Sequence, residues 1–169
     1  MHIFFRLSVV LLFGAIAAGC ASGRGPRFAV DESQLNWLEI AYRPSDPAME
    51  PCQLKLLGTG SISLRKGISP QLADSFSTDV AHPGWNDVST FVASIPPSEM
   101  RQVFQSFLDA GALDSPRSDR KEGVLPGRAF VVLTSKFKAG RSYRRATADA
   151  KLVGMVERLV RWVEMQEME

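Results

Sequence analysis

Histidine and cysteine are both scarce, because the chain of 169 residues holds only two of each. Most protein zinc sites and most histidine-based active sites need several of these side chains at regular spacings. One histidine, His2, lies at the very start of the chain, which leaves His82 as the single histidine of the main body. The scarcity therefore excludes most metal centres and most histidine-dependent catalytic sites.

The chain also lacks a strong charge of either sign and a very long apolar run. Its formal net charge is +2, which is too small to argue for nucleic-acid binding. The composition, with 45% hydrophobic and 22% charged residues, is typical of one ordinary globular domain. It excludes a disordered tail protein, a collagen-like repeat and a disulfide-dense miniprotein. The longest apolar stretch, residues 7–18, is shorter than the roughly 20 residues that span a bilayer.

Common catalytic motifs are absent as well. No G-x-S-x-G sequence provides a nucleophile elbow. The glycines at 58 and 60 precede a predicted strand, so they do not form the start of a phosphate-binding helix. No two acidic residues lie at predicted strand ends as an acid–base pair would. The sequence therefore predicts no catalytic residue, no metal and no bound cofactor.

The first twenty residues, MHIFFRLSVVLLFGAIAAGC, are typical of an export signal. A single basic residue, Arg6, precedes the apolar stretch, and small residues follow it. The run Ala17-Ala18-Gly19-Cys20 resembles the lipobox of bacterial lipoproteins, although Ala17 stands where leucine is commoner. The resemblance covers these twenty residues alone.

This resemblance implies a covalent lipid at Cys20, which would anchor the chain in the cell envelope. Several acyl chains on one cysteine suffice for stable anchoring. Ala21, in place of aspartate, implies the outer membrane, facing the periplasm, if the cell is Gram-negative. We then expect a removed signal peptide over 1–19, a flexible lipidated tether over 20–34 and one globular domain over 35–169. A plain export signal with a chance cysteine is the alternative.

The second cysteine, Cys52, has no intramolecular partner if Cys20 carries a lipid. A lone exposed thiol is a liability in an oxidising compartment. We therefore expect Cys52 to be buried as a small hydrophobic residue. A reactive thiol is the alternative.

Hydrophobic alternation predicts several β-strands. Residues 52–66 alternate apolar and polar side chains about a Gly-Thr-Gly turn, which is typical of a half-buried hairpin. Residues 129–146 predict a second hairpin, and its unbroken apolar run over 129–133 suits a strand buried on both faces. Further strands are expected at 35–42 and 88–95.

Two segments show helical periodicity. In the first, Ser98 is expected to cap the helix and Gly111 to end it in a left-handed conformation. In the second, Asp149 is expected to cap a helix with an apolar stripe from Leu152 to Val163. The pattern predicts a two-layer α+β domain, with an antiparallel sheet of about 4–6 strands, two hairpins and two helices packed on one face.

The segment 67–87 contains His82 and Trp85 around a Pro-Gly turn. Its plainest interpretation is a turn whose Trp85 packs on the domain. Both side chains would also suit a recognition loop, because tryptophan is frequent at binding hot spots. An active site built on His82 is a further alternative.

Basic residues concentrate in one part of the chain. Residues 117–151 hold ten basic and three acidic side chains, whereas the preceding part of the domain has an acidic excess. The candidate binding residues here are Arg128, Arg141, Tyr143, Arg144 and Arg145. This surface would suit an anionic membrane or an anionic envelope polymer. A solvated hairpin face that discourages aggregation is the alternative.

These observations favour a non-catalytic envelope lipoprotein that acts as a binding or assembly module. Its partners would be membrane lipid through Cys20 and an envelope protein or anionic envelope polymer, with no nucleic acid. The second hypothesis is an envelope hydrolase, or an inhibitor, that uses the 67–87 segment around His82. A third is a structural subunit whose sheet edge binds another strand.

Overall fold

A computed structural model describes residues 29–46, 49–67, 89–113, 127–137 and 142–166. The strands in these ranges are β1 (Trp37–Arg43), β2 (Cys52–Leu57), β3 (Ser61–Lys66), β4 (Thr90–Ser94), β5 (Phe130–Lys136) and β6 (Ser142–Thr147). The helices are α3 (Pro97–Asp109) and α4 (Ala150–Gln166).

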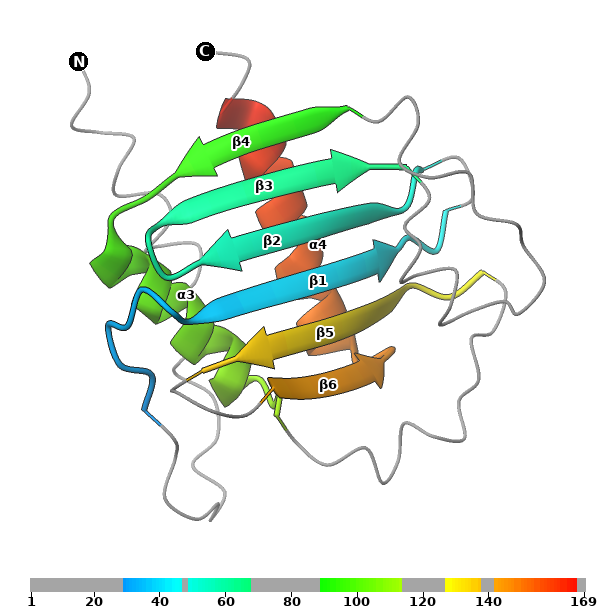
Figure 1. Cartoon of the computed structure of the whole chain (residues 1–169). Helices are drawn as coiled ribbons and strands as arrows, with labels where there is room; N and C mark the ends of the chain where they lie inside the picture. Colours follow the sequence, from blue (N-terminus) through cyan, green and yellow to red (C-terminus); the bar gives the residue numbers. More distant parts are fainter. Residues whose placement is uncertain (1–28, 47–48, 68–88, 114–126, 138–141, 167–169) are drawn as a thin grey trace.

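The strands form one antiparallel six-stranded sheet in the order β4-β3-β2-β1-β5-β6 (Figure 1). The hairpin of β2 and β3 flanks β1 on one side, and the hairpin of β5 and β6 flanks it on the other. Both predicted hairpins are confirmed as strand pairs, and the strand expected near residues 88–95 is confirmed as β4. The first strand in the sequence thus lies inside the sheet and joins the two hairpins.

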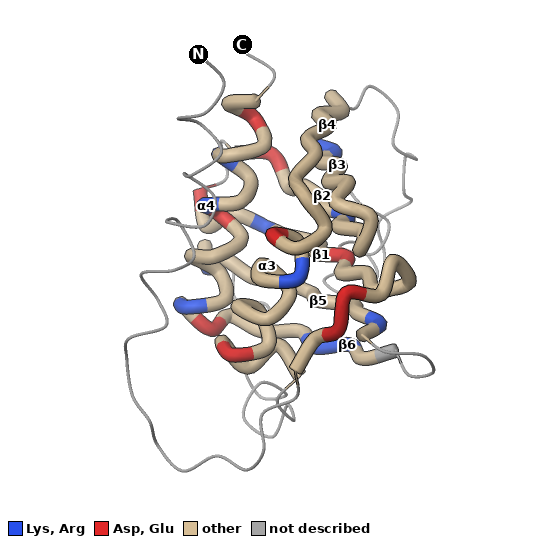
Figure 2. The backbone as a smooth tube through the Cα atoms, turned by 90° about the vertical axis from the view of Figure 1, so that its left-hand side faces the viewer, with Lys and Arg blue, Asp and Glu red and all other residues tan. Residues whose placement is uncertain are grey.

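Both helices lie on the same side of the sheet, as the edge-on view shows (Figures 1 and 2). α4 crosses the sheet and contacts β3, β4 and β5. α3 packs near one end of β5, where the rings of Phe104 and Phe137 are 5.2 Å apart. The predicted two-layer α+β architecture with two helices on one face is confirmed.

The core lies between the sheet and the two helices. In β2 and β3 every second side chain is buried there, namely Leu54, Leu56, Ile62 and Leu64. The helices contribute the matching apolar faces, with Phe104 and Phe107 from α3 and Leu152 to Val163 from α4. Burial of this apolar surface is the main stabilising term for such a fold.

β5 follows the predicted pattern for a strand that is covered on both faces. Its side chains from Phe130 to Leu133 are all buried. Val131 and Leu133 belong to the main core, whereas Phe130 and Val132 form a second, smaller cluster with Ala41. Because alternate residues of a strand point to opposite faces, this small cluster lies on the sheet face away from the helices.

The start of α3 differs from expectation. The residue that precedes the helix is Pro96, no side chain caps the helix, and Ser98 lies within the first turn. The prediction that Ser98 caps the helix is therefore wrong. Proline at N1 explains the shift, because its fixed φ suits the first helical position and its missing N–H removes an unpaired donor.

The end of α3 and the start of α4 agree with the sequence. Gly111 adopts φ +93°, and Ala112 N–H donates to the Phe107 carbonyl at 2.9 Å, which together form a Schellman cap. The Asp149 carboxylate accepts hydrogen bonds from the backbone N–H groups of Lys151 and Leu152 at 3.0 and 3.1 Å. Both predicted caps are confirmed.

The hairpin turn between β2 and β3 requires glycine at position 60. Gly60 has φ +97°, and its carbonyl accepts a hydrogen bond from the Ile95 N–H at 3.0 Å. A Cβ at this position would lie 2.0 Å from the Ile95 carbonyl oxygen. The turn is thereby held against the chain that leaves β4.

The described part of the chain begins against the helix layer. Val30 is buried in the main core, and its N–H donates to the Gln105 side chain of α3 at 3.0 Å. Asn36 is also buried and donates to Asp31. Residues of the expected tether over 20–34 therefore belong to the packed domain. The domain includes Val30, so its boundary lies before residue 34.

Polar groups cluster where β1, β2 and β3 meet α4. Cys52 is buried, as expected. The Tyr42 hydroxyl donates to the Glu157 carboxylate at 2.8 Å, and Lys66 forms an ion pair with Glu164. Burial raises the pKa of the Cys52 thiol from 9.0 to about 12, and burial with the Glu157 hydrogen bond raises the pKa of Tyr42 well above 10.0.

These raised pKa values predict a loss of stability in alkali. The unfolded chain releases the protons of Cys52 and Tyr42 at lower pH than the folded chain does. The free energy of unfolding should therefore fall as the pH rises from about 9 to about 12, by at most about 1.4 kcal/mol per pH unit for each group. Urea unfolding at several pH values measures this slope.

The matched variants are Cys52→Ala and Tyr42→Phe, each compared with the parent by its slope and not by its absolute stability. Both should be made in a Cys20→Ser background, so that Cys52 is the only thiol. Each variant should flatten the alkaline decline. An unchanged slope in the double variant would show that neither buried group controls it.

Candidate functional site

The sheet has one face under the helices and one face that no described helix covers (Figure 2). We call the second face the open face. Strand register places its side chains in rows that run across all six strands. One such row contains Val92, Ser63, Lys55, Glu39, Thr134 and Arg144. The open face therefore combines residues from both hairpins and from the strand between them.

Charge on the open face is strongly one-sided. The basic side chains that the strands place there are Arg43, Lys55, Arg65, Lys136 and Arg144. Glu39 is the one acidic side chain on the described strands. A chain that is almost neutral as a whole thus presents a basic surface on one side of its sheet.

The two basic strand residues that point toward the helices have partners within the domain. Lys66 pairs with Glu164 and lies 5.6 Å from the centroid of the Phe91 ring. Arg145 donates to the Gly111 carbonyl at the end of α3. By contrast, Lys55 and Arg65 on the open face are exposed and make no ion pair within the described ranges.

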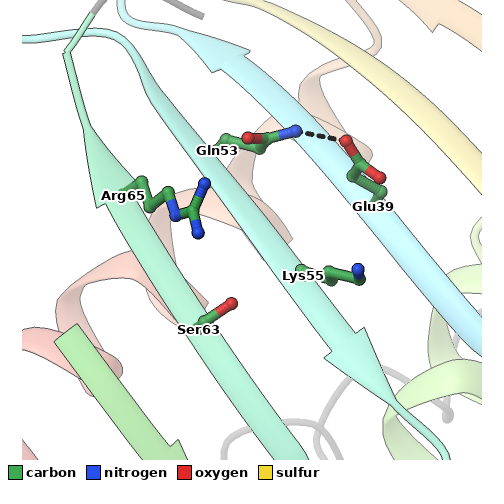
Figure 3. A pocket seen from close by; sticks show the side chains of 5 residues that line it. All are labelled: Glu39, Gln53, Lys55, Ser63 and Arg65. Atoms are coloured by element: carbon green, nitrogen blue, oxygen red, sulfur yellow. Dashed lines mark hydrogen bonds between the residues drawn. The ribbon is translucent and has the colours of Figure 1, made fainter. Parts of the chain in front are cut away.

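A shallow depression of about 230 Å³ lies on the open face over β1, β2 and β3 (Figure 3). Its lining side chains are Glu39, Gln53, Lys55, Ser63 and Arg65. All five are polar, and two of them are cations. The depression is smaller than the roughly 300–1,000 Å³ of usual small-molecule pockets. It therefore suits contact with part of a larger ligand better than enclosure of a whole small one.

Within the depression, the Gln53 amide donates to the Glu39 carboxylate from the neighbouring strand (Figure 3). This contact orients an anionic acceptor toward the middle of the basic face. Lys55 stands directly opposite Glu39 in the strand register, and Arg65 stands opposite Gln53. The site thus offers cations, a carboxylate, an amide and a hydroxyl within one small area. Such a set binds anions and hydrogen-bonds neutral polar groups.

Beside the polar area, the open face carries the small apolar cluster of Ala41, Phe130 and Val132. Ala146 and Ala148 pack against it from β6 and the residues that follow. Arg43 pairs with Phe130 in the strand register, and partial burial lowers the pKa of its guanidinium. The open face is therefore polar over β2 and β3 and more apolar over β5 and β6.

The structure separates the candidate residues that the sequence grouped in the second hairpin. Arg144 is exposed on the open face, whereas Arg145 is part-buried on the helix side. Tyr143 is exposed and shares the face of Arg145, and Arg128 is exposed just before β5. Of these residues, Arg144 alone lies on a strand of the basic open face. The others do not join it in one strand row.

The remaining candidates, Arg141, His82, Trp85 and the lipidation residue Cys20, lie outside the described residues. The segment 67–87 that contains two of them is described only at Gly67. Their predicted roles stay predictions.

Sequence reasoning missed the depression, although one signal for it was present. The alternation over 52–66 already placed Lys55, Ser63 and Arg65 opposite the apolar side chains. What the alternation could not supply was the strand order that brings Glu39 of β1 beside them.

Within the described ranges, no group of three histidine, cysteine or acidic side chains is arranged to hold a metal ion. Likewise, none of the described helices is long and apolar enough to cross a membrane.

Comparisons of the chain with models of protein families, with curated proteins and with solved structures found no match.

Proposed function

We propose that this protein is a lipid-anchored envelope protein that acts as a non-catalytic binding or assembly module. Cys20 would carry the lipid, and the open face of the sheet would bind the partner. The proposal places the anchor and the binding surface on different parts of the chain. The domain then presents its sheet to other components of the envelope.

The observation that carries this proposal is the one-sided charge of the open face. Among the residues of the described strands, five cations lie on this face with a single carboxylate, Glu39. The cations are Arg43, Lys55, Arg65, Lys136 and Arg144. A solvated surface that merely discourages aggregation needs charges mainly on the edge strands. Here Lys55 and Glu39 lie on β2 and β1, inside the sheet. This placement favours a binding surface.

The path of the chain into the domain also supports the proposal. Val30, near the start of the described residues, packs against α3 in the helix layer. The stretch from Cys20 to Val30 reaches at most about 35 Å when fully extended. An anchor on this short stretch would hold the helix layer close to the membrane and leave the open face accessible to other components.

Charge reversal on the open face should abolish binding to the cell envelope. The variant Lys55→Glu with Arg144→Glu changes both hairpins, and we expect it to lose most of its co-sedimentation with the isolated envelope fraction of the source cells. The matched control reverses two exposed cations of the helix layer, Arg101→Glu with Lys151→Glu. Both variants change the net charge equally, and circular dichroism checks their folding.

For this experiment the proteins should begin at position 20 and carry Cys20→Ser, so that neither the apolar segment 1–19 nor a lipid pulls them into the pellet. Equal co-sedimentation of both variants and the parent would contradict the proposed role of the open face.

The anchor is tested separately by the intact mass of the protein extracted from membranes. We expect the mass of a chain that begins at Cys20, increased by the acyl groups on that residue. A Cys20→Ser chain should show neither the cleavage nor the added mass. A parent protein without added lipid would refute the anchor and leave a secreted protein.

A further inference from the structure

We infer that the open face binds an acidic polysaccharide, and that Glu39, Gln53, Lys55, Ser63 and Arg65 contact one sugar unit with its carboxylate. The inference rests on the proposed function, because it names the ligand class of the same surface. The proposed ligand is a carbohydrate polymer that carries carboxylates. A protein, a phosphate polymer and a lipid surface are the competing ligand classes.

The charge of the depression is complementary to that of a carboxylate polymer. Lys55 and Arg65 are both exposed, line the depression and make no ion pair within the described ranges. An arginine guanidinium and a lysine ammonium at one site bind carboxylates through charge-assisted hydrogen bonds. Further cations on the same face, Lys136 and Arg144, lie on β5 and β6. A ligand that uses all of them extends across the sheet, as a polymer does.

Glu39 lies among these cations and favours a ligand that also carries hydrogen-bond donors. A carboxylate repels an anion, so a surface built for bare anions gains nothing from it. The Glu39 carboxylate accepts a hydrogen bond from Gln53 and retains further acceptor positions. These positions suit the hydroxyl groups of a sugar, which donate hydrogen bonds. Ser63 adds a hydroxyl that can donate or accept in the same depression.

The size and position of the site fit this ligand. A depression of about 230 Å³ receives one unit of a chain and leaves its neighbours on the surface. Trp37 lies two residues before Glu39 on the same strand face and is half-buried. Its ring adds an apolar surface against which the C–H groups of a neighbouring sugar can pack. The same strand thus supplies a polar contact and an apolar one.

A lipid surface fits the geometry less well. Val30 packs in the helix layer, on the face of the sheet opposite the depression. A bilayer also presents a dense layer of phosphates, against which Glu39 would be unfavourable. The position of Glu39 therefore favours a ligand with donors between its charges.

The test measures binding of short oligogalacturonate by titration calorimetry to a Cys20→Ser protein that begins at position 20. Oligomaltose of matched length is the neutral control, and oligoglutamate and inorganic polyphosphate are polyanions without hydroxyl groups. We expect the uronate to bind more tightly than any of these. Lys55→Gln and Arg65→Gln should each weaken uronate binding about tenfold, because each removes a charge-assisted contact. Lys151→Gln in the helix layer should leave it unchanged.

The variant Glu39→Gln separates recognition of sugar hydroxyls from simple attraction of charge. If Glu39 accepts hydrogen bonds from the sugar, this variant weakens uronate binding by a factor of about five to ten. The same variant strengthens polyphosphate binding, because it removes a negative charge. Opposite signs for the two ligands are the expected result.

Several results would overturn the inference. These are absence of uronate binding, tighter binding of oligoglutamate, polyphosphate or phosphatidylglycerol vesicles, or a Glu39→Gln variant that binds uronate more tightly than the parent. Any of these results would refute the ligand class. If envelope co-sedimentation still requires the open face, the proposed function as a binding module stands. Co-sedimentation that does not require the open face would refute the proposed function itself.

Discussion

The main apolar core of the six-stranded sheet lies under helices on one face, and the rest of the structure depends on this arrangement. Leu54, Leu56, Ile62 and Leu64 must all point toward α3 and α4 to leave water. Because strand side chains alternate, the residues between them must then point the other way. The direction of Lys55, Ser63 and Arg65 is thus a consequence of core burial.

The order of the strands brings the outward-pointing side chains of different strands together on the open face. β1 lies between the two hairpins, so Glu39 meets Lys55 on one side and Thr134 on the other. The cations that face the helices, Lys66 and Arg145, are used within the domain by Glu164 and by the Gly111 carbonyl. The face opposite the core carries Arg43, Lys55, Arg65, Lys136 and Arg144. The same strands therefore bury one set of side chains in the core and present the alternate set on the proposed binding surface.

Periodicity predicted most of the fold, because it records which side chains leave water. It predicted both hairpins, whereas the caps at Gly111 and Asp149 followed from residue type and the burial of Cys52 from the chemistry of a lone thiol. The predicted start of α3 was wrong, because proline at position 97 occupies the first helical position and Ser98 then lies within the first turn. The depression could not be predicted, because its carboxylate and its cations come from segments that only the strand order brings together. The basic cluster of the second hairpin, in turn, was divided between two faces by alternation at Arg144 and Arg145.

The most direct test of the central claim is site-specific photo-crosslinking in growing cells. A photoreactive residue at position 63 lies on the open face, and one at position 151 lies in the helix layer. The account predicts that position 63 forms an adduct with an envelope component, and that Lys55→Glu with Arg144→Glu removes this adduct. Adducts at position 151 alone, or an adduct at position 63 that survives charge reversal, would contradict the assignment of the open face as the binding surface.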